Sequence, residues 1–215
     1  MSRTKQQTPL KSVDNYAVSV INLSSYVKPV VSEDSYSNDE WVKYGEDNNY
    51  FGYVNDRYYG SPTNNAIING LAEMIYGGGL RVRDGSEADQ LNIDELFDEE
   101  SVQMICHDFK RQGNAAFEVI KMKSGNKFTI NHLPIETIRA NKANEKGEID
   151  KFWFCNDWAM FEKGTNPTLK PISIPAFKGK DSAPKSIVFI RAYQPNTFYY
   201  SPPDYQGALP YAELE

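Results

Sequence analysis

The sequence predicts an α+β fold that consists of antiparallel β-sheets with a few short helices. Two stretches, residues 62–76 and 102–111, have the periodicity of amphipathic helices. Between and after them, short runs of β-branched and aromatic residues alternate with turn-forming residues. The expected strands are residues 16–23, 80–83, 114–123, 127–133, 151–155 and 186–190. A hairpin turn at Ser124-Gly125-Asn126 makes two of these strands antiparallel.

The helix at residues 62–76 has clear start and stop signals. Ser61 is expected as the N-cap, Pro62 suits the first helical position, and Gly77 suits the left-handed conformation that ends a helix. Its apolar stripe consists of Ile67, Leu71, Met74 and Ile75, with Ile68 on the flank and Asn65, Asn69, Glu73 and Tyr76 opposite. We expect this stripe to face the core, because burial of each large residue stabilises by roughly 1.5–3 kcal/mol. A second, short aromatic helix is expected at residues 50–59.

The glycine triplet at residues 77–79 is not a phosphate-binding loop. Such a loop precedes its helix, so that the amides of the helix N-terminus face the anion, whereas these glycines follow a helix. We interpret them as helix termination. The alternation of Leu80-Arg81-Val82-Arg83 then predicts an edge strand.

An acidic cluster precedes the second amphipathic stretch. It consists of Asp94, Glu95, Asp98, Glu99 and Glu100. Carboxylates at a helix N-terminus complement its positive dipole end, while the alternative is a pair of catalytic carboxylates. An ordinary helix follows, with Val102, Ile105, Cys106 and Phe109 on one side and Lys110, Arg111 and Gly113 at its end. That context favours the helix N-terminus.

Composition limits the classes of function. The 215 residues carry a net charge of −6, which argues against an electrostatic nucleic-acid binder. No run of 18 apolar residues predicts a membrane span, and no apolar core of a signal peptide is present at the N-terminus. Cys106 and Cys155 are expected to be buried free thiols, with a disulfide as the alternative.

The residues predict no catalytic, cofactor-binding or metal-binding site, and hence no enzyme and no cofactor. Cys106 and His107 are adjacent on a helix and point about 100° apart, so they do not form a catalytic dyad. The remaining histidine, His132, is expected inside a strand. Two histidines without cysteine pairs do not make a zinc site.

Three stretches stand out in chain order. The first is Trp41-Val42-Lys43-Tyr44-Gly45-Glu46-Asp47-Asn48, with Ser61-Pro62-Thr63, Ala66-Ile67-Ile68 and Gly77-Gly78-Gly79-Leu80 after it. The second is Gln112-Gly113-Asn114-Ala115-Ala116-Phe117, and the third is Tyr199-Tyr200-Ser201-Pro202-Pro203-Asp204-Tyr205. In this order, across most of residues 41–215, they resemble the N-terminal part of portal proteins of tailed bacteriophages. The resemblance stops where the stem, clip, tunnel loop and crown of that family would begin.

The resemblance implies a portal wing-like domain at residues 16–209. A flexible arm is expected at residues 1–15, and the start of a truncated stem helix at residues 210–215, so that the parent chain would continue. Portal proteins form a dodecameric ring at one capsid vertex, where they dock the packaging motor, pass double-stranded DNA and seat the tail. The candidate subunit-interface residues are Tyr199, Tyr200, Pro203, Asp204 and Tyr205, with core packing under a loop as the alternative for the three tyrosines.

The partners implied by the resemblance are proteins of the virion. They are further copies of the same chain, the major capsid protein, the terminase and the head–tail connector proteins, while DNA passes without specific binding and no membrane is involved. The expected location is the capsid portal vertex, or the host cytoplasm during assembly.

Two other classes remain open from the sequence. A carbohydrate-binding or glycoside-cleaving β-rich domain would also be acidic and aromatic, but its carboxylates would lie on facing strands. Here the carboxylates gather at expected helix starts and turns. A generic phage structural or adaptor protein is the third possibility.

Overall fold

The computed structural model describes residues 33–34, 38–122 and 127–214. Its α-helices are α1 (Tyr50–Gly60), α2 (Pro62–Tyr76), α3 (Glu87–Leu96), α4 (Glu99–Gln112), α5 (Trp158–Glu162) and α6 (Leu209–Ala212). Its strands are β1 (Glu33–Asp34), β2 (Lys43–Tyr44), β3 (Asn114–Lys121), β4 (Phe128–Leu133), β5 (Ile138–Ala140), β6 (Lys151–Phe154), β7 (Ile172–Pro175) and β8 (Lys185–Arg191). Three short 3₁₀ helices are η2 (Ile135–Thr137), η3 (Gly179–Asp181) and η4 (Gln206–Ala208). The predicted arm at 1–15, the strand at 16–23 and the turn at 124–126 lie outside the described residues.

The strands confirm the predicted α+β fold class. β3 lies between β4 and β8 in one sheet, and β6 lies between β5 and β7 in the other. Every pair of neighbouring strands in these two sheets is antiparallel. The strands predicted from residues 114, 127, 151 and 186 onward are therefore confirmed, with ends that differ by a few residues.

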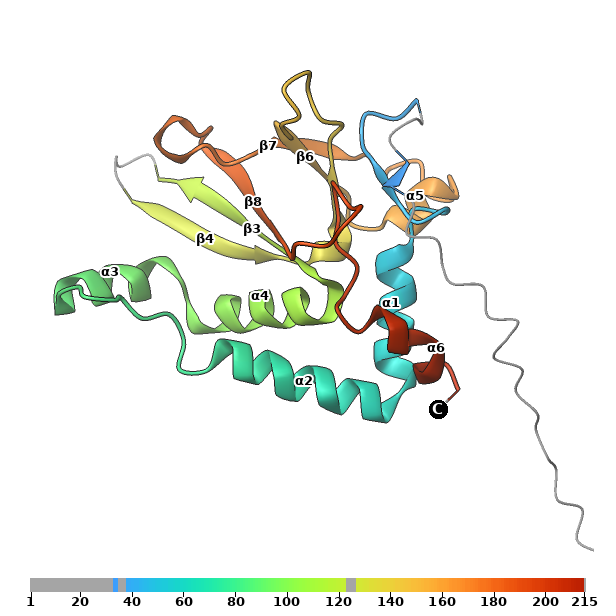
Figure 1. Ribbon diagram of the computed structural model, residues 1–215. Helices are drawn as coiled ribbons and strands as arrows, with labels where there is room; N and C mark the ends of the chain where they lie inside the picture. The colour runs from blue at the N-terminus through green and yellow to red at the C-terminus, as the bar shows by residue number, and fades with distance from the viewer. Residues whose placement is uncertain (1–32, 35–37, 123–126, 215) are drawn as a thin grey trace, which may run out of the picture.

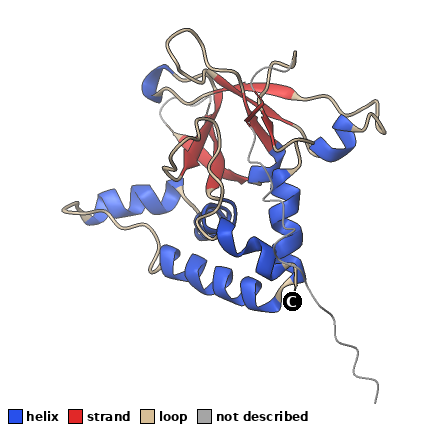
Figure 2. Cartoon of the chain, turned by 45° about the vertical axis from the view of Figure 1, so that its right-hand side comes forward, coloured by secondary structure: helices blue, strands red, loops and turns tan. Residues whose placement is uncertain are grey.

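The sheets and the helices form separate layers. Helix α4 contacts β3 and β4 on one side and α2 on the other, so it lies between the sheet and α2. Helix α1 crosses the helical layer at one end, and α3 projects from the other end (Figure 1). Figure 2 shows the same division after rotation, with the strands above and the helices below.

Helix α2 has the predicted ends but the opposite buried face. The Ser61 hydroxyl accepts a hydrogen bond from the Asn64 amide, and Gly77 ends the helix with φ of 56°. The predicted core stripe of Ile67, Leu71, Met74 and Ile75 is between 37% and 78% exposed, so that prediction was wrong. Ile68 and Ala72 are the buried residues of α2 instead.

A polar network explains why the other face of α2 can be buried. Tyr58 donates to Asn69 Oδ1 at 2.7 Å, and His107 Nε2 lies 3.0 Å from the same oxygen. Asn69 Nδ2 in turn donates to Asn65 Oδ1 at 2.9 Å. Burial lowers the pKa of His107, so the ring is neutral at pH 7 and needs no counter-ion. Burial of polar groups that have hydrogen-bond partners costs little free energy. The apolar pattern alone therefore predicted the wrong buried face of α2.

Adjacent isoleucines test this assignment. Ile68→Ala is expected to destabilise the fold by about 2–4 kcal/mol, because Ile68 is 1% exposed and its removal leaves a cavity. Ile67→Ala is expected to change the free energy of unfolding by less than about 0.5 kcal/mol, because Ile67 is 55% exposed. Both substitutions replace isoleucine by alanine in the same helix, so the change in helix propensity is the same and does not contribute to the difference between the two variants. Equal losses in denaturant titrations would contradict the observed packing.

The segment after α2 differs from the prediction in two ways. Residues 80–83 form no strand; Val82 N instead donates to Gln90 Oε1, and Gln90 Nε2 donates to Leu80 O. Gln90 belongs to α3, a helix that the sequence analysis missed. The signal for α3 was present as a capping box, in which Ser86 and Asp89 satisfy each other's backbone amides.

Helix α3 also divides the acidic cluster. Asp98 is the N-cap of α4, and Glu99 and Glu100 occupy its first turn, as predicted for a helix N-terminus. Asp94 and Glu95 lie instead in the last turn of α3, where the dipole does not favour carboxylates. The prediction is therefore correct for three of the five residues. At the other end of α4, Gly113 is the left-handed C-cap, as predicted.

The main core is aromatic and joins distant parts of the chain. Its buried members are Val42, Tyr44, Tyr50, Phe51, Val54, Ala116, Ile135, Ile138, Ala140, Phe152, Ile174, Ile187, Tyr200 and Leu209. A smaller cluster of Phe117, Val119 and Ile130 lies on the other face of β3 and β4. Cys106 and Cys155 are free thiols, as predicted, but only Cys155 is buried, and Cys106 is half-buried. Each helix in the described ranges is too short or too polar to cross a bilayer.

Candidate functional site

Three segments that carry the resemblance meet in one place, whereas residues 61–80 of the first stretch belong to α2 and the residues around it. Residues 41–48, 112–117 and 199–205 come from β2, the α4–β3 boundary and the segment before α6. We call the place where they pack together the junction. It is held by backbone and side-chain hydrogen bonds whose partners are between 87 and 158 residues apart.

Tyr200 is the centre of the junction. Its side chain is fully buried, and its hydroxyl donates to Val42 O at 2.6 Å and accepts from Ala140 N at 2.9 Å. Its ring stacks on Tyr44, with centroids 4.5 Å apart, and meets Phe51 edge to face. One side chain thus satisfies two backbone groups of two different strand segments and fills the core between them.

Gly113 and Asn114 bind the same segment from the other side. Asn114 Nδ2 donates to Ser201 O at 2.7 Å, and Ser201 N donates to Asn114 Oδ1 at 2.9 Å. Gly113 has a φ of 72°, and a Cβ placed there would lie 2.6 Å from Ser201 O and 2.7 Å from Pro202 O. Glycine is therefore required twice, by the left-handed backbone and by the close approach of another backbone.

The remaining candidate interface residues flank Tyr200. Tyr205 is half-buried and its hydroxyl donates to Arg111 O at 2.7 Å, whereas Pro203 is buried. Tyr199 is half-buried and accepts from Ala143 N at 3.2 Å. Asp204 is exposed and pairs with Lys110 at 2.6 Å. These side chains have partners within their own chain, and their role in a subunit interface stays a prediction.

Glu33 anchors the same segment, although the sequence analysis did not select it. Its carboxylate accepts hydrogen bonds from three successive amides, those of Phe198, Tyr199 and Tyr200, at 2.8–3.1 Å. No local motif marks this residue, because its partners lie about 165 positions away. The three amides are thereby satisfied without a strand partner.

Arg139 is a second residue that the sequence did not reveal. It is 1% exposed; its Nε donates to Asn48 Oδ1 at 2.6 Å and its Nη2 to Asn48 O at 2.8 Å. The guanidinium also lies over the rings of Phe51 and Trp158. Burial lowers the pKa of Arg139 to about 10. Arg139 Nη1 also donates to Glu136 O and Ile138 O, and together these contacts hold the turn at Asn48 against β5.

Asp108 connects helix α4 to the sheet. Its Oδ1 accepts a hydrogen bond from Arg111 Nη2 at 2.7 Å. Its Oδ2 lies 2.8 Å from His132 Nε2 and accepts a hydrogen bond from Ile135 N at 3.2 Å. Asp108 and Arg111 are both under 10% exposed. From the sequence, His132 is expected inside a strand, and Asp108 is not among the candidate site residues. The i, i+3 spacing of Asp108 and Arg111 was the available signal.

These groups form supports rather than a cavity with converging reactive atoms. No cluster of three or more His, Cys, Asp or Glu side chains that could hold a metal occurs among residues 33–34, 38–122 and 127–214. Burial raises the pKa of both Cys106 and Cys155, which disfavours the reactive thiolate. The arrangement is suited to holding distant segments in fixed positions.

The buried tyrosines predict alkaline unfolding. Burial raises the pKa of Tyr44, Tyr200 and Tyr205 above the ordinary value of 10.0. The folded protein keeps these phenols protonated at pH values where the unfolded chain ionises them, so their stabilisation is complete below pH 10 and is lost as the pH rises further. Arg139 has a lowered pKa and acts in the opposite direction, but three tyrosines outweigh it.

Spectrophotometric titration measures this effect. At least three of the 14 tyrosines are expected to ionise only together with the loss of the folded circular dichroism signal. Tyr205→Phe removes one phenol from that late group. Complete ionisation of all tyrosines in the folded state would contradict the burial of these side chains.

Comparisons with known proteins do not assign the chain to a family. No protein-family model matches the sequence, and a search of curated proteins returns no match. The functional assignment depends on the three motif stretches and on the geometry of the junction.

Proposed function

We propose that this chain is a structural component of a bacteriophage portal vertex, with the role of the wing in a ring around a passage for double-stranded DNA. One observation carries the proposal: residues 41–48, 112–117 and 199–205, which belong to the three stretches that resemble portal proteins, pack against one another in the junction. Asn114 and Ser201 exchange two hydrogen bonds, and Tyr200 binds Val42 O. Motifs that were selected separately, by resemblance, are thus parts of one structural unit.

The charge of the chain suits a conduit. A protein that neutralises phosphates releases counter-ions and holds DNA, which would oppose sliding. This chain has 29 acidic and 23 basic residues, and a net charge of −6. In the proposed role the ring therefore repels the duplex and takes its affinity from protein neighbours, which are further copies of the chain, the major capsid protein, the terminase and the connector proteins. The proposed location is the capsid vertex, after assembly in the host cytoplasm.

Native mass spectrometry of the full-length protein tests the proposal. A closed ring of about twelve copies is expected, from the resemblance, and electron microscopy is expected to show a central channel. Electrophoretic mobility of duplex DNA is expected to be unchanged by the protein at physiological salt. A protein that binds duplex tightly, or that stays monomeric at every concentration, would refute the proposal.

Tyr205 provides a variant for the same measurement. Tyr205→Ala is expected to lower the yield of rings, because it removes a half-buried ring that orders the segment before α6. Tyr205→Phe is the matched control: it removes only the hydrogen bond to Arg111 O and is expected to retain most of the rings. Unchanged ring yield for Tyr205→Ala would reject the interface role of this residue.

A further inference from the structure

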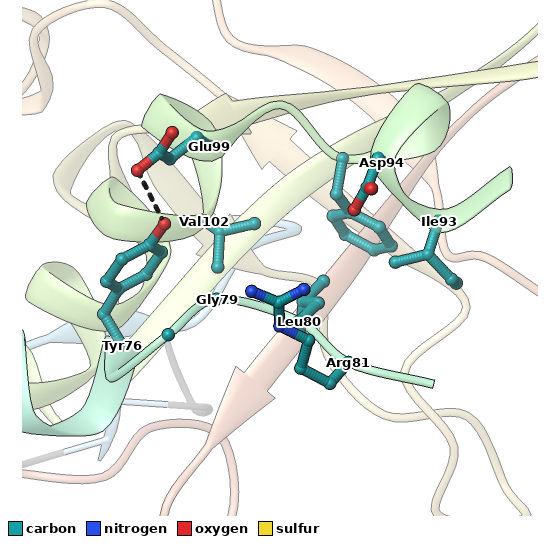
Figure 3. Close-up of a pocket in the computed structure, with 10 residues that line it drawn as sticks. Tyr76, Gly79, Leu80, Arg81, Ile93, Asp94, Glu99 and Val102 are labelled. Carbon is teal, nitrogen blue, oxygen red and sulfur yellow. Dashed lines mark hydrogen bonds between the residues drawn. The ribbon is translucent and has the colours of Figure 1, made fainter. Parts of the chain in front are cut away.

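A pocket of about 380 Å³ lies between the end of α2, the segment after it, and helices α3 and α4. Its apolar residues are Leu80, Ile93, Phe97 and Val102, and its polar residues are Tyr76, Arg81, Asp94 and Glu99. Figure 3 shows Glu99 and Tyr76 on one side of the pocket and Asp94 and Ile93 on the other, with Val102 between them. The pocket is thus a groove of mixed character, with apolar side chains, two carboxylates on opposite sides and the guanidinium of Arg81.

Hydrogen bonds fix the walls of this groove. Tyr76 donates to Glu99 Oε1 at 2.9 Å and joins α2 to the start of α4. Gln90 donates to both Leu80 O and Asp94 Oδ1, and accepts from Val82 N. The groove is therefore formed before any partner arrives, which lowers the entropic cost of binding.

The groove belongs to a strongly acidic part of the molecule. Residues 84–109 contain nine carboxylates and no lysine or arginine. Eight of these carboxylates are on or beside α3 and the first turn of α4, where α3 projects from the helical layer (Figure 1). On α3 itself, Leu91 is 60% exposed. This surface, which we call the acidic groove, combines apolar side chains with a negative rim.

A complementary surface exists on the other layer of the same chain. Residues 163–191 contain six basic residues and one acidic residue. Lys170 and Lys180 flank β7 and are exposed, and two exposed apolar side chains, Ile172 and Phe177, lie between them. We call this surface the basic edge. Asp94, Glu99, Lys170 and Lys180 form no ion pair with any residue in the described part of the chain.

We propose that the acidic groove of one copy of the chain binds the basic edge of a second copy. Ile172 and Phe177 would supply the apolar centre of the contact, and the lysines would face Asp94 and the neighbouring carboxylates, which gives an apolar centre with a charged rim. Two different surfaces meet, so the contact is head to tail and propagates around a closed ring. This inference rests on the proposed ring function, because the contact is the one between neighbouring copies in the ring.

Two charge-reversal variants test the pairing. The groove variant is Asp94→Lys with Glu95→Lys; both positions are in the last turn of α3, where cations are favoured by the helix dipole. Asp94 lines the groove, whereas Glu95 lies beside it and pairs with Lys127 at 3.4 Å at exposed positions. The edge variant is Lys170→Glu with Lys180→Glu, at exposed positions. Each variant alone places like charges opposite each other. An equimolar mixture of the two variants restores opposite charges. The positive groove of the groove variant then meets the negative edge of the edge variant, and the negative groove of the edge variant meets the positive edge of the groove variant.

Sedimentation velocity of the full chain measures the association. We expect the unmodified protein to self-associate and to dissociate at about 1 M salt, where the Debye length is ~3 Å. Each reversal alone is expected to weaken association by more than about tenfold, and the equimolar mixture is expected to regain it. Glu46→Lys with Asp56→Lys alters the net charge as the groove variant does, at exposed positions on and before α1, and is expected to have no effect.

The outcomes separate this inference from the ring proposal. Self-association that both reversals leave unchanged overturns the inference, while a ring in native mass spectrometry still supports the portal role. A mixture that stays dissociated also overturns it. Open chains in the mixture, without closed rings, support the charge pairing and count against the ring. Undiminished self-association of the groove variant would also overturn the head-to-tail contact, because its reversed groove and its own basic edge carry like charges.

Discussion

Replacement of Tyr200 by alanine is expected to destabilise the fold by about 4 kcal/mol or more. Truncation of a buried aromatic side chain to alanine costs 3–5 kcal/mol, and here two buried backbone groups also lose their partner. Those groups are Val42 O and Ala140 N. In a domain of this size each kcal/mol lowers the midpoint of thermal unfolding by roughly 2–4 °C, so a fall of about 8 °C or more is expected.

Two further variants separate the causes. Tyr200→Phe keeps the stack on Tyr44 and removes only the hydroxyl, and is expected to cost about 1–3 kcal/mol. Tyr193→Ala is the control, because Tyr193 is 87% exposed, and a change below about 0.5 kcal/mol is expected. If Tyr200→Ala were no worse than Tyr193→Ala, Tyr200 would not be the centre of the core.

Gly113→Ala is expected to have a comparable effect for a different reason. An alanine here must adopt a left-handed φ, which costs roughly 1–2 kcal/mol. Its Cβ would also lie 2.6 Å and 2.7 Å from two backbone oxygens, those of Ser201 and Pro202. Backbone cannot rotate away as a side chain can, so the segment has to move and its exchange of hydrogen bonds with Asn114 is lost. We expect a total cost of roughly 3–5 kcal/mol.

Gly147 is the matched control for this prediction. Its φ of 76° is close to that of Gly113, but no heavy atom lies within 4 Å of a Cβ placed there. Gly147→Ala is therefore expected to cost only the roughly 1–2 kcal/mol of the left-handed backbone. Urea titrations of both variants measure the difference, which isolates the contact with residues 201–202. Similar losses at the two glycines would mean that this contact is not tight.

Local signals in the sequence predicted the elements well. Ser61 and Gly77 marked the ends of α2, Gly113 marked the end of α4, and the hydrophobic runs marked β3 and β6. These predictions succeeded because capping and strand periodicity act between residues a few positions apart. The capping box at Ser86 carried the same kind of signal for α3 and was overlooked.

Partners that are distant in the chain could not be predicted in this way. The apolar stripe of α2 faces solvent because the polar face is buried, where Asn69 contacts Tyr58 and His107. No sequence pattern near Asn69 predicts these two contacts. Arg139 and Asp108 are buried although their residue types are usually exposed. Tyr200 was selected through a family resemblance, which marks a residue but does not say which atoms it contacts.

The contact between Tyr200 and Val42 has a consequence for synthesis of the protein. The two residues are 158 positions apart, so a ribosome working at 5–20 residues per second needs roughly 8–30 s to add Tyr200 after Val42. Throughout that interval the nascent chain holds Tyr44 and Phe51 without the ring that packs against both. Completion of the core therefore follows translation of the last segment, and Tyr44 and Phe51 lack this packing partner until then.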